Sequence, residues 1–232
     1  MSNDDPARQP IEELLRQTQT DVTPDPDEGF RIAELAFQQA ETPLQRGVAA
    51  RQAAFRAAQL GKTRDIVDHW FDLSRQAFAG DDPESQRGLA AAEVLTGRAY
   101  GLFCVRMGEA AVDFAQTAAD ATAAFGRAEA ILQRQHVRGQ TWDRFGTMAD
   151  RHRATHEAMS GDARLAARVA LRGTWRAVRA RKEGSLAAHT RFVLKQLSRN
   201  ALAGTLAASR ALEQPGFTHN ARQWLALKLL DR

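Results

Sequence analysis

Apolar side chains recur at helical spacing along most of this chain, and short polar interruptions divide the pattern into segments. The clearest apolar face lies between residues 64 and 78. Within it, Phe71 and Phe78 are seven positions apart, so they share one stripe of an α-helix, and Trp70 lies beside that stripe. We expect these three aromatic side chains to bury in one hydrophobic interface, either inside the chain or between subunits.

Start and stop signals for helices punctuate the pattern. Thr42, Pro43 and Gln45 have the order of a capping box with proline at the first helical position. Gly61 stands where the C-cap of the helix over 43–60 is expected, and Asp82 can cap the helix expected over 85–107. The expected helices cover residues 30–41, 43–60, 64–78, 85–107, 109–136, 141–159, 162–182 and 185–212, with a short one near the C-terminus.

The composition favours the same conclusion. The 232-residue chain contains 44 alanines but only 14 valines and isoleucines. Alanine is the best helix former, whereas strands need β-branched residues. We therefore predict an all-α protein of about eight to ten helices, arranged as an antiparallel helical bundle or an irregular helical array. A tetratricopeptide-like repeat solenoid is an alternative, although the interruptions are not evenly spaced.

Charge is distributed unevenly along the chain. Residues 1–120 contain 12 Lys and Arg against 20 Asp and Glu, a net charge of −8, whereas residues 121–232 contain 20 against 8, a net charge of +12. We expect three parts: an acidic mobile N-terminal arm over 1–28, an acidic helical half over 29–138 and a basic helical half over 139–232.

The expected arm has two features. Residues 21–28 hold four acids and two prolines, a composition that does not form a core. Ile11, Leu14 and Leu15 form a short amphipathic turn before it. The arm is either a partner-docking peptide or a first helix docked on its own domain, and both interpretations stay open.

No catalytic motif is recognisable. The chain has no phosphate-binding loop, no nucleophile elbow and no Cys-x-x-Cys pair, and Cys104 lies in an apolar stretch that predicts a buried, inert thiol. We expect no enzymatic activity and no cofactor. The acidic N-terminus lacks a signal-peptide pattern, and no apolar run approaches the roughly 18 residues of a membrane span. These features predict a cytoplasmic protein without a transmembrane segment.

Two histidines raise the question of a metal site. His152 and His156 are four positions apart, so they share a helix face and could bind zinc. The pattern is not the zinc motif His-Glu-x-x-His, because Arg153 occupies the position of its general base. Only His136 or His189 could approach as a further ligand. Because arginine and histidine alternate here without apolar neighbours, we expect a solvated face and no metal.

Residues 162–182 carry the most distinctive pattern of the chain. Five arginines recur at spacings of four or three and form one continuous stripe on the predicted helix. Small residues on the opposite side, such as Ala166, Ala170, Gly173 and Ala177, suit close packing, so we expect the arginines to face outward. The candidate anion-binding residues are Arg164, Arg168, Arg172, Arg176, Arg179 and, at the edge of the stripe, Trp175.

The arginine stripe has three possible roles. Guanidinium groups pair well with phosphate and an indole can stack on a base, so the stripe could bind nucleic acid or another polyanion. It could also pair with the acidic half of the chain, within one copy or between copies. The remaining possibility is a solvated face, since no helix-turn-helix pattern marks a recognition helix.

One part of the chain resembles a known family. Residues 65–125 are similar to phasins, small helical proteins that coat polyhydroxyalkanoate storage granules. The resemblance implies a helical coat protein that has no catalytic residues and that binds a granule surface. It is carried by Trp70-Phe71-Asp72-Leu73, Ala77-Phe78, Asp82-Pro83-Glu84 and Gln86, followed by a long alanine-rich helix.

The sequence therefore predicts a non-catalytic helical association protein, of which a phasin-like granule coat is one form. We expect a homo-oligomer or a complex with a protein partner. Two alternatives remain: a nucleic-acid-binding protein that uses the arginine-rich helix, and a tetratricopeptide-like interaction scaffold.

Overall fold

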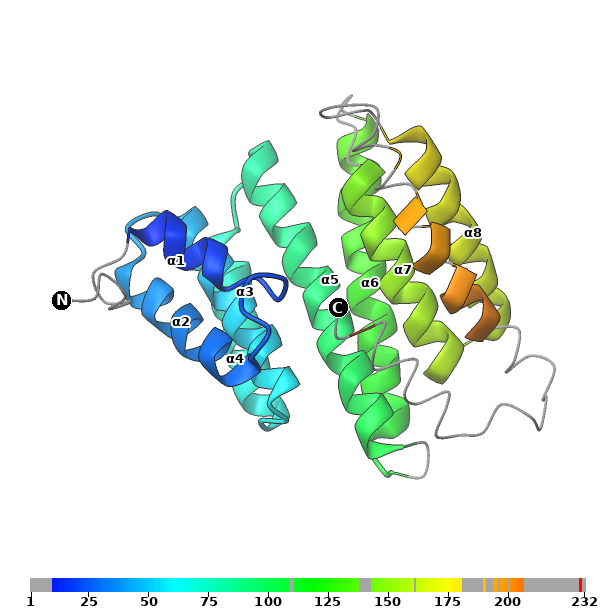
Figure 1. Cartoon of the computed structure of the whole chain (residues 1–232), viewed down its shortest axis with the longest axis horizontal. Helices are drawn as coiled ribbons and strands as arrows, with labels where there is room; N and C mark the ends of the chain where they lie inside the picture. The colour runs from blue at the N-terminus through cyan, green and yellow to red at the C-terminus, as the bar shows by residue number, and fades with distance from the viewer. Residues whose placement is uncertain are drawn as a thin grey trace. The chain divides into compact units, whose positions relative to one another are not determined.

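The computed structural model describes residues 10–108, 111–137, 143–160 and 162–180, with short stretches at 190, 194–195, 197–199, 201–206 and 230 (Figure 1). Regular secondary structure in these residues is helical, and no strand occurs among them, which confirms the all-α prediction. Most of the helix expected over 185–212 lies outside the described residues. The labelled helices are α1 (Ile11–Gln17), α2 (Pro26–Gln39), α3 (Pro43–Gln59), α4 (Arg64–Ala77), α5 (Pro83–Met107), α6 (Phe114–Val137), α7 (Asp143–Ser160) and α8 (Ala163–Arg179).

Two compact units make up the chain, Met1–Ala99 and Tyr100–Asp231. The division falls within α5, whereas the sequence predicted a boundary at residue 138. The physical reason is that α6, assigned to the acidic half, packs against α7 of the basic half, so both helices belong to one unit.

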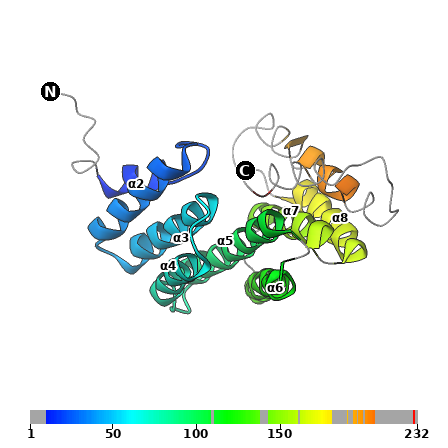
Figure 2. The ribbon, with the colours of Figure 1, turned by 90° about the horizontal axis from the view of Figure 1, so that it is seen from below.

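In the first unit, α3 lies between α2 and α4 (Figure 2). The predicted capping box begins this helix: Gln45 N donates to Thr42 Oγ1 at 3.2 Å, and Thr42 N donates to Gln45 Oε1 at 3.1 Å. Small side chains along α3 allow both neighbours to approach closely. Its fully buried alanines are Ala49, Ala50, Ala53, Ala54, Ala57 and Ala58.

Phe78 anchors the end of α4 in a notch between two glycines. A Cβ atom at Gly47 of α3 or at Gly88 of α5 would lie less than 3.0 Å from its ring. Ser74 Oγ also donates a hydrogen bond to Gly47 O at 2.9 Å. Both Phe71 and Phe78 are completely buried, so these two aromatic residues form part of the core of the first unit.

Trp70 occupies a different position from its two aromatic neighbours. It is half-buried and packs edge-on against two rings of α2, with centroid distances of 5.2 Å to Phe37 and 6.4 Å to Phe30. The aromatic face of α4 therefore packs within the first unit, where Trp70 contacts α2 and Phe78 contacts α3 and α5.

Residues 10–28 are not a mobile arm, and that prediction was wrong. Leu14 of α1 is fully buried in a cluster with residues of α2 and α3. The buried guanidinium of Arg56 on α3 donates to Thr18 O at 3.1 Å and to Thr23 O at 2.5 Å. These bonds fix the link between α1 and α2, so the docked-helix alternative is correct for the described part of this segment.

In the second unit, α7 packs against both α6 and α8. The close packing of α8 was expected from its small residues, and the structure confirms it: Ala166, Ala170, Gly173 and Ala177 are buried. The predicted buried thiol of Cys104 is also confirmed. Among the described helices, none has an apolar stretch long enough to cross a bilayer.

Candidate functional site

The arginine stripe of α8 divides into two groups. Arg172 and Arg176 turn toward α7, where both pair with the buried carboxylate of Asp150. The distances are 2.6 Å from Arg172 Nη2 to Asp150 Oδ1 and 2.9 Å from Arg176 Nη1 to Asp150 Oδ2. The expectation that all five arginines face outward is therefore wrong for these two, because they lie at the margin of the stripe nearest to α7.

A network of ion pairs extends from this contact across the three helices. Glu129 of α6 accepts from Arg172 and, at 2.6 Å, from Nη1 of Arg153 on α7. Burial is the largest single effect and opposes the charge of Arg172, but the hydrogen bonds and negative charges of Asp150 and Glu129 together outweigh it and raise the pKa of Arg172. Arg172 therefore serves as an internal cation that joins α8 to α6 and α7.

The outer side of α8 carries a ridge of large apolar side chains. Leu171 and Trp175 are each 61% exposed, and Val178 is 52% exposed. Leu171, Trp175 and Val178 are spaced by four and three positions, so they line up along the helix. Such a row of exposed apolar residues is typical of an interaction surface.

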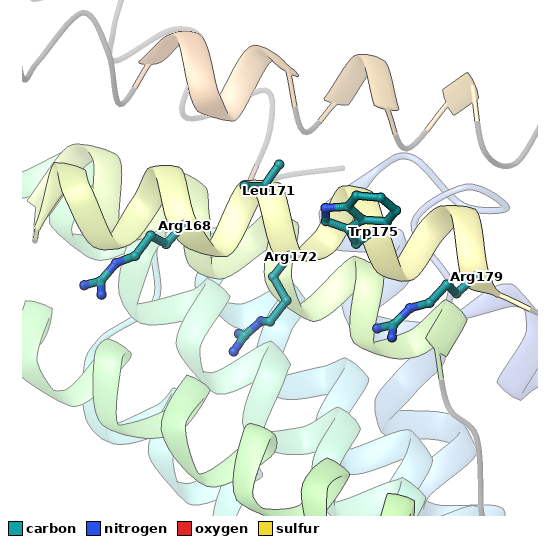
Figure 3. Close-up of a pocket in the computed structure, with 5 residues that line it drawn as sticks. All are labelled: Arg168, Leu171, Arg172, Trp175 and Arg179. Carbon is teal, nitrogen blue, oxygen red and sulfur yellow. The ribbon is translucent and has the colours of Figure 1, made fainter.

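Exposed arginines adjoin this ridge. At 100° per residue, Arg164, Arg168 and Arg179 fall within the same arc of about 100° as the apolar residues. An open groove of about 550 Å³ is lined by Arg168, Leu171, Arg172, Trp175 and Arg179. Figure 3 shows the three arginine side chains of this groove extended from one edge of α8, with Leu171 pointing away from them. We call the exposed set the α8 face: Arg164, Arg168, Leu171, Trp175, Val178 and Arg179.

Leu171 and Val178 were missing from the candidate residues chosen from the sequence. A helical wheel centred on the arginines would have found them, because both fall within the exposed arc. The roles of Glu129 and Asp150 had no comparable signal, since neither residue belongs to a recognisable motif with Arg172.

The histidines of α7 do not lie on a solvated face, and that expectation was wrong. His152 and His156 are each 1% exposed, because α7 is covered by both α6 and α8. His156 Nε2 lies 3.2 Å from Ala118 O and 3.3 Å from Thr122 Oγ1. Burial lowers the pKa of His156 to about 4, so this imidazole is neutral at physiological pH.

A metal site gains no support from these neighbours. Within the described residues, no three His, Cys, Asp or Glu side chains come together as a metal would require. Hydrogen bonds also occupy the acidic groups beside the histidines, since Glu157 accepts from Thr122 at 3.2 Å. The histidines therefore act in packing and hydrogen bonding inside the three-helix core.

Comparisons with protein-family models, with curated proteins and with solved structures found no match. The shape and charge of the α8 face are therefore the basis for a functional proposal.

Proposed function

We propose that this chain is a non-catalytic association protein that binds acidic protein segments through the α8 face. The observation that carries the proposal is the apolar ridge of Leu171, Trp175 and Val178 with exposed arginines beside it. Burial of apolar surface is the dominant favourable term in most protein association, and tryptophan and arginine are among the residue types most enriched at the energetic centres of interfaces.

The composition of the face favours a protein over a polyanion. Two of the five arginines in the stripe are already paired with carboxylates of the chain itself, which leaves Arg164, Arg168 and Arg179 for an external partner. A phosphate backbone would neutralise these three charges but would leave Leu171 and Val178 in water. A protein segment with both carboxylates and apolar side chains would match the whole face.

Nucleic acid remains the second candidate because of one feature. Trp175 is largely exposed in a groove with Arg168 and Arg179, and an exposed indole beside guanidinium groups can stack on a base. The granule coat implied by the phasin-like segment is the third candidate, because an exposed apolar ridge can also adsorb to a polymer surface.

The test compares three probes with one set of variants. The probes are a synthetic amphipathic helix with Leu and Glu faces, a single-stranded oligonucleotide and polyhydroxybutyrate granules. The double variant Leu171→Ala/Trp175→Ala removes the two most exposed side chains of the ridge without touching the core. Ile66→Ala, which removes a side chain that is 41% exposed on α4, is the matched control.

We expect the acidic helix to bind the wild-type protein and the Ile66→Ala variant alike, and to bind the ridge variant at least about tenfold more weakly. A version of the peptide with Gln in place of Glu should also bind more weakly. Failure of the acidic peptide to bind contradicts the proposal. Tight oligonucleotide binding that Arg168→Gln weakens would favour the nucleic-acid candidate, and ridge-dependent adsorption to granules would favour the coat.

A further inference from the structure

An acidic surface lies in the first unit, in the link between α1 and α2 and the first turn of α2. Residues 21–28 contain Asp21, Asp25, Asp27 and Glu28 and no basic residue, and all four acids are exposed. Asp25 caps α2, which begins at Pro26, because its side chain accepts from Asp27 N at 3.1 Å. The backbone of the link is held by Arg56, so the carboxylates are presented from a fixed support.

This segment also offers apolar contacts. Val22 is 36% exposed and Pro24 is exposed beside it. Proline is a rigid apolar ring that packs well on an indole, and valine suits an aliphatic neighbour such as Leu171. Residues 21–28 therefore combine carboxylates with apolar side chains, the combination that the α8 face requires.

We propose that the α8 face binds residues 21–28 of a second copy of this chain. The inference rests on the proposed function and names its partner. Charge complementarity carries the inference, because the α8 face has three exposed arginines and the segment has four exposed acids. The same contrast runs through the whole chain, whose residues 1–120 carry a net charge of −8 and whose residues 121–232 carry +12. Because Arg56 pre-organises the segment, binding costs less conformational entropy than capture of a loose peptide.

The contact joins two unlike surfaces. Each copy has one α8 face and one acidic segment, so two copies can exchange both contacts in a reciprocal dimer, or several copies can join head to tail in a ring or open chain. In every case the number of acidic segments equals the number of α8 faces, and charge reversal on one surface can be compensated by reversal on the other.

The experiment uses two charge-reversal variants of the full chain and sedimentation velocity over a range of concentrations. One variant is Asp21→Lys/Asp27→Lys/Glu28→Lys, which keeps the Asp25 cap. The other is Arg164→Glu/Arg168→Glu/Arg179→Glu. The matched controls reverse exposed charges elsewhere, Asp65→Lys on α4 and Arg134→Glu on α6. Thermal melting of each variant establishes that it is folded.

We expect the wild-type protein and both controls to self-associate, with an apparent dissociation constant that rises with salt concentration. Each reversal variant alone should associate at least about tenfold more weakly, because each contact then opposes like charges. An equimolar mixture of the two variants should recover association, since every contact again pairs opposite charges.

Three results would overturn the inference. The first is a wild-type protein that stays monomeric at all concentrations, and the second is self-association that the variants leave unchanged. The third is a mixture that fails to recover association. If the acidic helix still binds in a ridge-dependent way, the second copy is not the partner, but the proposed function stands. If that peptide also fails to bind, the proposed function fails as well.

Discussion

Arg172 of α8 donates two hydrogen bonds to Asp150 Oδ1 of α7, from Nε at 3.1 Å and from Nη2 at 2.6 Å. The carboxylate is almost completely buried, and its second oxygen accepts from Arg176. One aspartate therefore holds two arginines of the stripe. If either side of this ion pair is removed, the charge of the other side stays in a poorly solvated site without compensation.

Removal of the Asp150 carboxylate should destabilise the second unit. We expect Asp150→Ala to lower the free energy of unfolding by about 3 kcal/mol, because Arg176 then loses this counter-ion and Arg172 keeps its pair with Glu129 alone. Asp65→Asn, at an exposed position of α4, is the control and should change stability by less than about 0.5 kcal/mol. Urea denaturation measures both. Equal, small losses would show that the ion pair contributes nothing to the fold.

Single substitutions should distinguish the two groups of arginines by the stability that each substitution costs. Arg172→Gln should cost about 1–3 kcal/mol, because Asp150 and Glu129 both lose a charged donor. Arg168→Gln, on the exposed face of the same helix, should cost less than about 0.5 kcal/mol, since Gln forms helices nearly as well as Arg. Thermal melts of the pair give the comparison. A greater loss for Arg168→Gln would reverse the assignment of inner and outer arginines.

Helical periodicity predicted α8 well, because the small residues and the arginines follow one another at the spacing of a single helix. It could not distinguish Arg172 from Arg168, since that distinction depends on Asp150 and Glu129, which lie 22 and 43 residues away in the chain. The same limit applies to His152 and His156, whose burial is decided by the helices on either side of α7.

Composition misled the prediction for the N-terminal segment for a similar reason. Acids and prolines over residues 21–28 cannot form a core by themselves, and the sequence alone therefore favoured a mobile arm. A single arginine on α3, Arg56, supplies the donors that the backbone carbonyls of the link accept. Its burial could not be read from the local pattern, because an arginine on a helix is usually solvated.

Loss of Arg56 should release this segment. We expect Arg56→Met to fill much of the same space but to leave Thr18 O and Thr23 O without their donor, so that residues 10–25 open more often. Amide hydrogen exchange should rise in α1 by at least about tenfold, while α4 exchanges as before. Arg31→Gln, an exposed arginine of α2, is the control. Unchanged protection of α1 would show that the apolar packing of Ile11, Leu14 and Leu15 is enough to hold the helix in place.

The glycine notch around Phe78 predicts a coupled pair of substitutions. Gly88→Ala should destabilise the first unit, because the added Cβ atom would overlap the buried ring of Phe78. Phe78→Ala should cost about 3–5 kcal/mol by opening a cavity. In the double variant Gly88→Ala/Phe78→Leu the loss should be smaller than the sum of the losses of Gly88→Ala and Phe78→Leu alone, since the smaller side chain relieves the overlap. Urea denaturation measures these losses, and strictly additive losses would contradict the close contact between Gly88 and the ring of Phe78.

Stability should depend on pH through His156. Burial lowers the pKa of this imidazole from 6.5 to about 4 in the folded protein. Between these two values the unfolded chain binds a proton that the folded chain does not, so the free energy of unfolding falls as the pH falls through this window. Above pH 6.5 the contribution is constant, because the imidazole is neutral in both states.

The variant His156→Gln isolates this contribution, because an amide can still donate to Ala118 O but does not titrate. At neutral pH we expect the wild-type protein to be the more stable of the two. As the pH is lowered from 6.5 to 4, that advantage should shrink by as much as about 1.4 kcal/mol per pH unit. Burial raises the pKa of the neighbouring Glu157, which works in the opposite direction, but this carboxyl is present in both proteins and cancels in the difference. Urea denaturation at several pH values measures the difference, and a constant value across the window would show that His156 is protonated as readily in the folded protein as in the unfolded chain.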